Sequence, residues 1–327
     1  MAVRILACDD VSSVGLDVLR QAGFEVVARP GIAQADLREI VAGFDALLVR
    51  SRTSVDAAVL QAGRKRLKLI GRAGFGLDRI AVDEASRLGV AVMQSPEGIA
   101  VTAAEFTLGQ IFCLARNIPR ADAAMRAGRW DKRRNRGVQL LGKTLGVLGM
   151  GNVGRAVAER AVLLGMNVIV HDPRVADEEV LAVGAQPVGW ENLLSGAHFI
   201  SVHVGASERT RGLVDERAFA QMREGVRIVN CSRGGVVSEA ALVGAIKTGK
   251  VAGAAIDVFD EEPPWGNELL ELPQVVVTPH LVSSTFEAQI QVARALAEQV
   301  RDYFQSGETR GIVNLEALEA EVTEASS

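Results

Sequence analysis

The sequence has little cysteine, few aromatic residues and no large excess of charge of either sign. Its three cysteines, Cys8, Cys113 and Cys231, are scattered and without C-x-x-C spacing, which argues against a disulfide framework or a zinc site and fits a reducing cytoplasm. Aromatic residues make up 4% of the chain, so we expect cores of aliphatic side chains. The formal net charge of −4 gives no indication of a nucleic-acid or membrane partner.

The layout of a secretory leader is also missing, because the chain enters an apolar, strand-like run within its first residues. The longest apolar-leaning region, residues 99–115, contains Glu105 and Gln110 among other polar side chains. We therefore expect a buried helix there rather than a membrane span. We also expect no metal site.

What is present is an alternation of short apolar runs with helix-like segments, which predicts a parallel sheet with helices on its faces. A helical stretch is expected over residues 100–127, a last long helix over 284–304, and a frayed acidic tail after 313. The expected strands are residues 4–7, 25–28, 46–49, 69–71 and 90–93, and then 144–148, 168–172, 199–203, 226–230, 253–257 and 275–278.

A chain of 327 residues suits two domains. We predict an α/β fold of two doubly wound parallel-sheet lobes. A Rossmann-type cofactor domain of residues 99–283 is inserted into a flavodoxin-like substrate domain of residues 1–98 plus 284–327. We expect the ligand site in a cleft between these lobes.

The most informative motif begins at residue 144, where a strand-length apolar run leads into glycines in the G-x-G-x-x-G pattern, Gly149, Gly151 and Gly154. Such glycines permit a tight turn, a close approach of the backbone to a pyrophosphate, and close packing of the following helix. The helix N-terminus offers N–H groups to the pyrophosphate. Asp172 follows about 20 residues later, where a carboxylate can accept the ribose hydroxyls. The pattern predicts dinucleotide binding, and the alternative is a tight turn without a ligand.

The acid also selects the cofactor. A carboxylate at Asp172 would repel the 2′-phosphate of NADP, so NAD is favoured. Arg174, two residues later, is the one residue that argues for NADP instead of NAD.

Three residue types at the ends of later strands suit hydride transfer from a 2-hydroxy acid. Arg233 can hold a carboxylate bidentately, His280 can act as general base, and Glu262 can orient the imidazole. Each residue has an alternative interpretation. Arg233 could be an arginine on a surface turn, and His280 could be a structural histidine, with His203 as the base instead. Glu262 could belong to a solvated acidic loop over residues 260–262.

With these motifs in place, the chain resembles the D-isomer-specific 2-hydroxyacid dehydrogenases, most closely their phosphoglycerate dehydrogenases in the short form. The resemblance extends over about residues 49–288. Besides the dinucleotide motif it includes VRSRT at 49–53, GRAG at 71–74, AAE at 103–105, VNCSRGG at 229–235, DVFDEEP at 257–263 and TPH at 278–280.

The resemblance implies roles for individual residues. Arg233 would clamp the substrate carboxylate, His280 would be the acid and base, and Glu262 its partner. It also implies a homodimer built through the cofactor domain. The expected substrate contacts are Arg52, Arg72, Ala73, Gly74 and Arg233. The expected NAD contacts are Gly149, Gly151, Asn152, Val153, Gly154, Asp172, His203, Val204, Cys231, Ser232, Asp257 and Ser283.

Some positions depart from the pattern of the family's phosphoglycerate enzymes and leave the substrate open. Those enzymes usually carry Thr or Asn at Phe75, Asn-Gly-Asn where this chain has Glu97 and Ile99, and Gly-Ala at Val282 and Ser283. The chain also leaves no room for the regulatory domain of longer phosphoglycerate dehydrogenases, so serine feedback through such a domain is not expected.

Basic residues favour a substrate with a second anionic group. Arg50, Arg52 and Arg72 follow strands of the first lobe, and residues 126–136 are rich in Arg. That arm is either a solvated connector or, as the resemblance implies, a segment that brings a cation to the partner subunit's active site.

We therefore predict an NAD-dependent dehydrogenase with D-3-phosphoglycerate as the first candidate substrate. One alternative is a reductase of hydroxypyruvate, glyoxylate or another small 2-oxo acid, such as a sulfonated one. The other is a non-enzymatic NAD-sensing scaffold like the C-terminal-binding-protein corepressors. The absence of long tails speaks against the scaffold.

Overall fold

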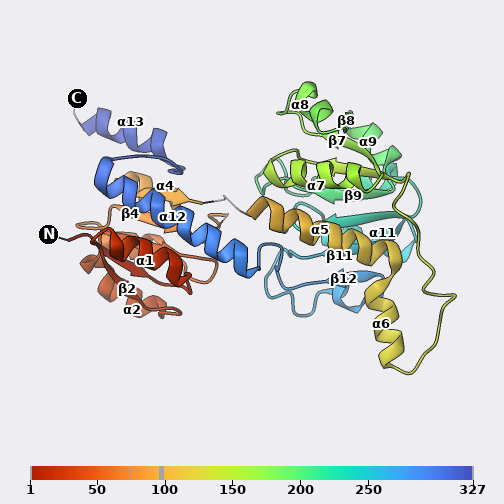
Figure 1. Cartoon of the computed structure of the whole chain (residues 1–327), viewed down its shortest axis with the longest axis horizontal. Coiled ribbons are helices and arrows are strands. Elements are labelled where there is room, and N and C mark those ends of the chain that lie inside the picture. The colour runs from red at the N-terminus through yellow and green to blue at the C-terminus, as the bar shows by residue number, and fades with distance from the viewer. Residues whose placement is uncertain (1, 75, 96–98, 326–327) are drawn as a thin grey trace. The chain divides into compact units, whose positions relative to one another are not determined.

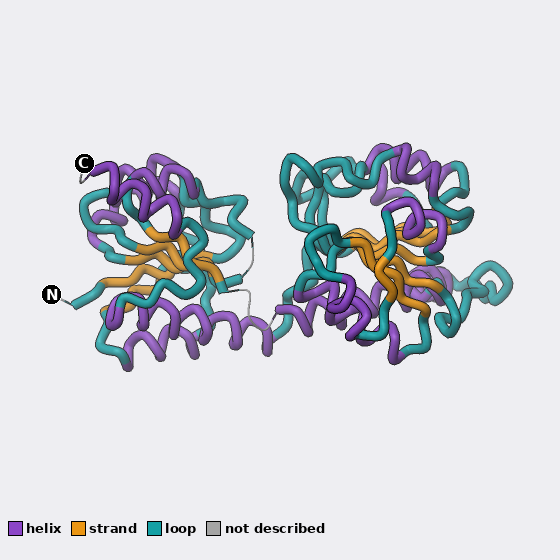
Figure 2. The backbone as a smooth tube through the Cα atoms, turned by 90° about the horizontal axis from the view of Figure 1, so that it is seen from above, coloured by secondary structure: helices purple, strands orange, loops and turns teal. Residues whose placement is uncertain are grey.

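The computed structural model describes residues 2–74, 76–95 and 99–325. The chain divides into two compact units, Met1–Ile99 with Thr285–Ser327 (unit 1) and Ala100–Ser284 (unit 2). Both ends of the chain belong to unit 1 (Figure 1). Each unit is an α/β fold with its strands between layers of helices (Figure 2).

Unit 1 contains a five-stranded parallel sheet in the order β2-β1-β3-β4-β5, the flavodoxin-like arrangement. Helices on both faces bury the sheet, which explains why its central strands are continuous apolar runs. The strands are β1 (Arg4–Ala7), β2 (Glu25–Ala28), β3 (Ala46–Val49), β4 (Leu69–Arg72) and β5 (Ala91–Gln94). The helices are α1 (Ser13–Gln21), α2 (Gln34–Ile40), α3 (Ala57–Gly63), α4 (Val82–Arg87), α12 (Phe286–Ser306) and α13 (Leu315–Ala325), with a 3₁₀ turn η1 (Val41–Gly43).

The long helix α12 brings the chain back to unit 1 and lies directly on α1. A Cβ at Gly15 of α1 would come 2.4 Å from the carbonyl oxygen of Ala293 in α12. Only a glycine therefore permits this approach of the two helices.

The expectation of a frayed tail after residue 313 is wrong, because the tail forms α13. Asn314, which is buried, fastens it to β5: its Oδ1 accepts the N–H of Val92 and its Nδ2 donates to Val90 O and Ser86 Oγ. Leu318 packs against the unit 1 core. The acidic composition of the tail gave no indication that the Asn314 amide would be buried or that Leu318 would pack against the core.

Unit 2 contains a seven-stranded parallel sheet in the order β12-β11-β10-β9-β6-β7-β8. The strand order reverses between β6 and β9, the place where open α/β sheets bind ligands. The strands are β6 (Thr144–Leu148), β7 (Asn167–His171), β8 (Gln186–Pro187), β9 (Phe199–Val202), β10 (Val226–Asn230), β11 (Val251–Ile256) and β12 (Val275–Val277). The helices are α5 (Ile99–Arg116), α6 (Ile118–Arg126), α7 (Asn152–Leu163), α8 (Asp177–Ala182), α9 (Trp190–Gly196), α10 (Glu216–Gln221) and α11 (Glu239–Lys247), with a 3₁₀ turn η2 (Glu268–Glu271).

The single helix expected over residues 100–127 is two helices, α5 and α6. Asn117 between them adopts a left-handed conformation (φ 53°), and Pro119 stands in the first turn of α6, where a proline is tolerated but cannot continue a preceding helix. In the described part of the chain, α5 is the one helix with the length and hydropathy to cross a membrane, and 44% of it is buried in the protein. Thr107 and Gln110 lie on its buried side, as in a core helix.

Candidate active site

The Gly-rich turn lies between β6 and α7, at the point where the strand order reverses. Gly149 has φ +93°, and a Cβ there would lie 3.0 Å from the backbone of His203. A Cβ at Gly154 would lie 2.0 Å from the carbonyl oxygen of Gly149, so this glycine lets α7 pack on the turn. A Cβ at Gly151 would meet nothing within 4 Å. Protein packing therefore does not require Gly151, and the space beside it is open to a ligand.

The start of α7 fits the pyrophosphate of a dinucleotide. Gly151 is the N-cap, and Asn152 and Val153 are the first residues of this 12-residue helix. Their N–H groups have no carbonyl within the helix to bind, and the helix dipole favours an anion there. Val204 closes one side of the turn, since its Cγ1 would lie 2.9 Å from a Cβ on Gly149.

Asp172 directly follows β7, one residue beyond the strand that it was expected to end. Its carboxylate is bonded to the Gly-rich turn by accepting the N–H of Met150 at 2.9 Å. It also accepts the N–H of Arg174, whose Nε lies 3.8 Å away as an ion pair. The Asp172 side chain is 6% exposed and that of Arg174 77%. The acid is thus fixed beside the turn, and the arginine next to it projects into solvent.

The segments with Arg233, Glu262 and His280 follow β10, β11 and β12, three adjacent strands. Strands that run in parallel place their carboxyl ends at the same edge of the sheet. A Cβ at Gly234 would lie 1.9 Å from the carbonyl oxygen of Phe259. The turn that carries Arg233 therefore lies against the loop that carries Glu262.

Asn230, the last residue of β10, shapes the turn that carries Arg233. Its buried side chain accepts from the N–H and the hydroxyl of Ser232 and donates to Arg233 O at 3.0 Å. The guanidinium of Arg233 donates to Ser232 O at 2.7 Å. Asn230 was not among the residues predicted from the sequence, although a polar residue at the end of a buried strand is a recognisable signal.

Asp257 holds the loop of His280. Its fully buried carboxylate accepts from the Thr278 hydroxyl at 2.6 Å and from the N–H groups of Leu281 and Val282 at 2.8 and 2.9 Å. Burial raises the pKa of Asp257, and these hydrogen bonds oppose the rise. His280 has a positive φ of 54°, a strained conformation for a non-glycine residue, which the bonds to Asp257 hold in place.

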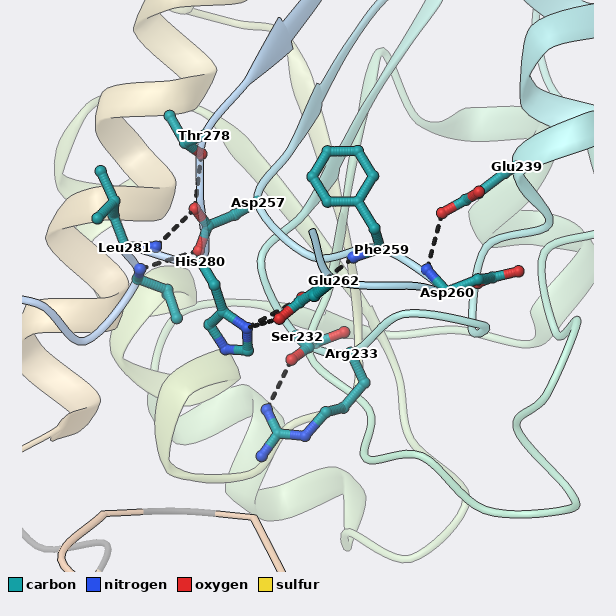
Figure 3. A network of polar contacts seen from close by, with 11 residues as sticks. Ser232, Arg233, Glu239, Asp257, Phe259, Asp260, Glu262, Thr278, His280 and Leu281 are labelled. Carbon is teal, nitrogen blue, oxygen red and sulfur yellow. Dashed lines mark hydrogen bonds and ion pairs between the residues drawn. The ribbon is translucent and has the colours of Figure 1, made fainter. Parts of the chain in front are cut away.

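His280 and Glu262 point toward one another (Figure 3), and Nδ1 of the imidazole lies 3.0 and 2.9 Å from the two carboxylate oxygens. Glu262 also accepts the N–H of Phe259 at 3.2 Å. Both side chains are about two-fifths exposed, His280 at 42% and Glu262 at 39%. With Nδ1 facing the carboxylate, Nε2 is the ring nitrogen left to exchange a proton with a ligand.

The other three histidines have structural partners. His198 accepts the N–H of Thr144, and Nδ1 of His171 bonds to Val188 O. Nε2 of His203 lies 2.8 Å from Ser201 Oγ, and burial lowers the pKa of His203 to about 4. A group that weak as a base is poorly suited to accept a proton near neutral pH, so the structure favours His280 over its rival.

The remaining expected cofactor contacts in unit 2 lie close to these groups. Cys231 is buried directly after β10, and burial together with the charge of Asp257 raises the pKa of its thiol. It is therefore an inert thiol. Ser283 follows the His280 loop and is half-buried.

Within the described residues, no group of three or more metal-ligating side chains is found.

Unit 1 places its expected substrate residues after β3, at the end of β4 and directly after β4; β3 and β4 are neighbouring strands. Asp9, buried, accepts from the N–H groups of Arg50 and Thr53, which fixes the loop where Arg52 is exposed. Asp9, an acid two residues after the buried strand β1, was not predicted from the sequence.

Arg72 donates to the carbonyl oxygens of Ala73 and Gly76 at 2.7 and 3.1 Å, and a Cβ at Gly74 would meet its guanidinium. Arg72 thus shapes the loop that it precedes.

Two of the positions that depart from the phosphoglycerate pattern, Phe75 and Glu97, lie outside the described residues. Ile99 begins α5 and packs against the unit 1 core. Val282 is buried, with its N–H bonded to Asp257. The larger residue at 282 is thus part of the packing behind the His280 loop.

The chain matches a known protein family. Residues 108–282 match the NAD binding domain of the D-isomer specific 2-hydroxyacid dehydrogenases. The chain belongs to this family. The match confirms both the resemblance and NAD as the cofactor that the Gly-rich turn is expected to bind, and the fold confirms the predicted class of two parallel-sheet α/β lobes.

Relatives cover nearly the whole chain. It is 41% identical to the D-3-phosphoglycerate dehydrogenase of Archaeoglobus fulgidus over 318 residues, 97% of the chain and 60% of that relative. Against the Bacillus subtilis protein of the same name it is 39% identical, over 96% of the chain and 59% of the relative. The chain thus spans about three fifths of the length of the curated relatives that it matches.

Solved structures of similar length have the same fold. The TT0316 protein of Thermus thermophilus superposes with a TM-score of 0.87 at 30% identity, over 95% of this chain and 100% of that one. A glyoxylate reductase of Paecilomyes thermophila superposes with a TM-score of 0.87 at 28% identity, over 96% and 99% of the two chains.

Proposed function

We propose that the protein is an NAD-dependent dehydrogenase that interconverts a 2-hydroxy acid and its 2-oxo acid, with D-3-phosphoglycerate and 3-phosphohydroxypyruvate as the first candidate pair. The observation that carries the proposal is the His280–Glu262 pair. Its two residues lie on the loops that follow β12 and β11, beside the turn of Arg233 that follows β10. Relatives that cover the chain at about 40% identity are D-3-phosphoglycerate dehydrogenases, which supports this substrate.

In the direction of oxidation, NAD supplies the acceptor for the hydride that leaves C2 of the substrate. Arg233 holds the 2-carboxylate in plane. Nε2 of His280 takes the hydroxyl proton as the C–O bond becomes a carbonyl, and Glu262 stabilises the imidazolium that results. In reduction His280 returns the proton. The products of oxidation are thus the 2-oxo acid, NADH and a proton on the enzyme.

The other groups are assigned to binding. Met150 and Asp172 connect the Gly-rich turn to the adenosine ribose, and the start of α7 binds the pyrophosphate. Positions at the Gly-rich turn and after the ends of β9 to β12 support the remaining proposed NAD contacts, which are His203, Val204, Cys231, Ser232, Asp257 and Ser283. Arg52 and Arg72 are assigned to the substrate's second anionic group. Ala73 and Gly74 are assigned to substrate binding.

The second candidate is the reduction of glyoxylate, hydroxypyruvate or another small 2-oxo acid. It is favoured by the likeness to a glyoxylate reductase. The test is a panel of 2-oxo and 2-hydroxy acids, with and without phosphate or sulfonate, followed by NADH absorbance. A preference of at least tenfold in kcat/KM for the phosphorylated pair supports the first candidate, and equal rates on glyoxylate support the second. A protein that binds NADH and turns over none of them would contradict both and favour the scaffold.

We further propose a homodimer built through unit 2 and a cytoplasmic location. Phe112, Ile118, Met125 and Trp130 are large apolar side chains exposed on α5, α6 and the segment that follows, which supports a second copy covering this face. The free, buried thiols of Cys8 and Cys231 fit a reducing compartment. Light scattering of the purified protein tests the dimer, and a monomer at micromolar concentration would contradict it.

A further inference from the structure

Glu262 lies on a loop, so the position of its carboxylate relative to the His280 imidazole depends on the contacts that hold this loop. The loop follows β11, which ends at Ile256, and enters η2 after Asn267. Between these points Glu262 is followed by Pro263 and Pro264, which donate no backbone hydrogen bond. The loop must therefore be fixed at its ends.

Both ends meet one carboxylate. Oε1 of Glu239 accepts the N–H of Asp260 at 2.8 Å, and Oε2 accepts Nδ2 of Asn267 at 2.6 Å. Figure 3 shows Glu239 facing the backbone of Asp260. Asn267 itself begins η2, because its Oδ1 accepts the N–H of Leu269 at 3.0 Å. One side chain thus spans the two ends of the segment that presents Glu262.

Glu239 is itself well anchored. It is the first residue of α11, behind the N-cap Ser238, whose hydroxyl accepts the N–H of Ala241. A carboxylate is favoured in this first turn by the helix dipole. The stretch that ends at Glu239 begins with Arg233, so the same backbone connects the arginine turn to the support of the Glu262 loop.

The geometry points to Glu239 as a positioning residue that sets the distance between Glu262 and His280. Phe259, whose N–H binds Glu262, is the neighbour of Asp260, whose N–H binds Glu239. When the carboxylate of Glu239 is lost, one of its two donors is left unpaired, and Glu262 is no longer held within hydrogen-bond distance of the imidazole. This inference rests on the proposed function, because it assigns Glu239 a task only through the His280–Glu262 pair.

The test is a double-mutant cycle of Glu239→Gln and Glu262→Gln, read by kcat and by the pH profile of 2-oxo acid reduction. Glutamine keeps the size of Glu239 but offers one acceptor oxygen for two donors. Loss of one hydrogen bond of this kind corresponds to about a 2- to 10-fold fall in kcat. The pH optimum of reduction should move downward, as is expected for Glu262→Gln, because the imidazolium loses its neighbouring carboxylate. In the Glu262→Gln background the further loss should be smaller than about 2-fold, because coupled residues are not additive.

The control is Glu216→Gln. Glu216 is the first residue of α10 behind the N-cap Asp215, the same place in its helix as Glu239, and it is exposed. It should leave kcat and the pH profile unchanged, which separates loop positioning from a general effect of acids in a first helical turn.

A second variant guards against a folding defect. Asn267→Asp keeps the oxygen that accepts the N–H of Leu269 but replaces the donor to Glu239 with a like charge, so it should reproduce the loss in kcat. Additive losses in the cycle, or an unchanged pH profile in both variants, would overturn the inference while leaving the proposed function intact. Failure of both variants to fold would also overturn it. Full activity of Glu262→Gln would remove the proposed pair and the inference together.

Discussion

The carboxylate of Asp172 lies 2.9 Å from the backbone nitrogen of Met150 and 3.8 Å from Nε of Arg174. The first contact fixes the acid at the Gly-rich turn, where it can accept the ribose hydroxyls of NAD. The second partly compensates the charge that would repel a 2′-phosphate. Cofactor choice therefore depends on which of the two side chains faces the ribose.

Replacing Asp172 should weaken the preference for NAD over NADP. Asp172→Asn keeps an oxygen for Met150 but removes the charge and releases Arg174 toward a 2′-phosphate. We expect the NADP/NAD ratio of kcat/KM to rise by about tenfold or more, as for the loss of a charge-assisted contact. The double variant Asp172→Asn with Arg174→Ala should lose the gain with NADP. Asp177→Asn, on an exposed acid in the first turn of α8, is the control. Equal use of both cofactors by the unmodified protein would contradict the role of Asp172.

His280→Ala should nearly abolish turnover and leave NADH binding close to normal. General acid–base catalysis contributes about 10²–10⁴-fold, and the imidazole is the group that Glu262 orients. Fluorescence titration with NADH separates binding from chemistry. His203→Gln is the comparison. Because His203 is assigned to NAD binding and not to proton transfer, this variant should keep most of its kcat at saturating NADH. If the His203 variant is the inactive one, the proton passes through that ring instead.

The buried ring of His203 should make the protein sensitive to mild acid. Its folded pKa of about 4 lies below the ordinary value of 6.5, so between these values the unfolded chain binds the proton and the folded protein does not. The contribution of this group to stability is therefore complete above about pH 6.5 and is lost as pH falls toward 4. At pH 5 the loss is about 2 kcal/mol.

Urea unfolding at pH 7 and pH 5 measures this loss. His203→Gln should remove most of the difference between the two pH values, whatever it does to stability at pH 7. An equal fall in the free energy of unfolding in the variant and the unmodified protein would assign the acid sensitivity to other groups.

Sequence reasoning found the parts of this molecule that depend on local patterns. The apolar runs of β1, β2 and β3 and the glycines of the dinucleotide turn are such patterns, and the structure has them where they were expected. The order of parallel strands then brings Arg233, Glu262 and His280 to one edge, which spacing along the chain alone does not show.

The contacts that hold these groups were not predictable in the same way. Asp257 read as a cofactor contact, yet its carboxylate is bonded to the loop of His280 through backbone N–H groups that no pattern reveals. Asn314 and Glu239 look like ordinary surface residues in the sequence. Their partners lie in β5 and in the Glu262 loop, and only the tertiary structure brings them together.

The last prediction concerns the charge of the substrate. Arg233 would hold the 2-carboxylate common to every candidate, so Arg233→Ala should damage all substrates alike. Arg52, exposed on the loop that Asp9 organises, would matter only for a second anionic group. Arg52→Ala should therefore raise KM for a phosphorylated or sulfonated 2-oxo acid by about 10- to 100-fold, the equivalent of one charge-assisted bond, and hardly change it for glyoxylate. Arg64→Ala, on an exposed arginine after α3, is the matched control.

Added salt should weaken binding of the dianionic substrate more than that of glyoxylate, because exposed charges are screened. Equal effects of Arg52→Ala on all substrates would leave the small 2-oxo acids as the better candidates.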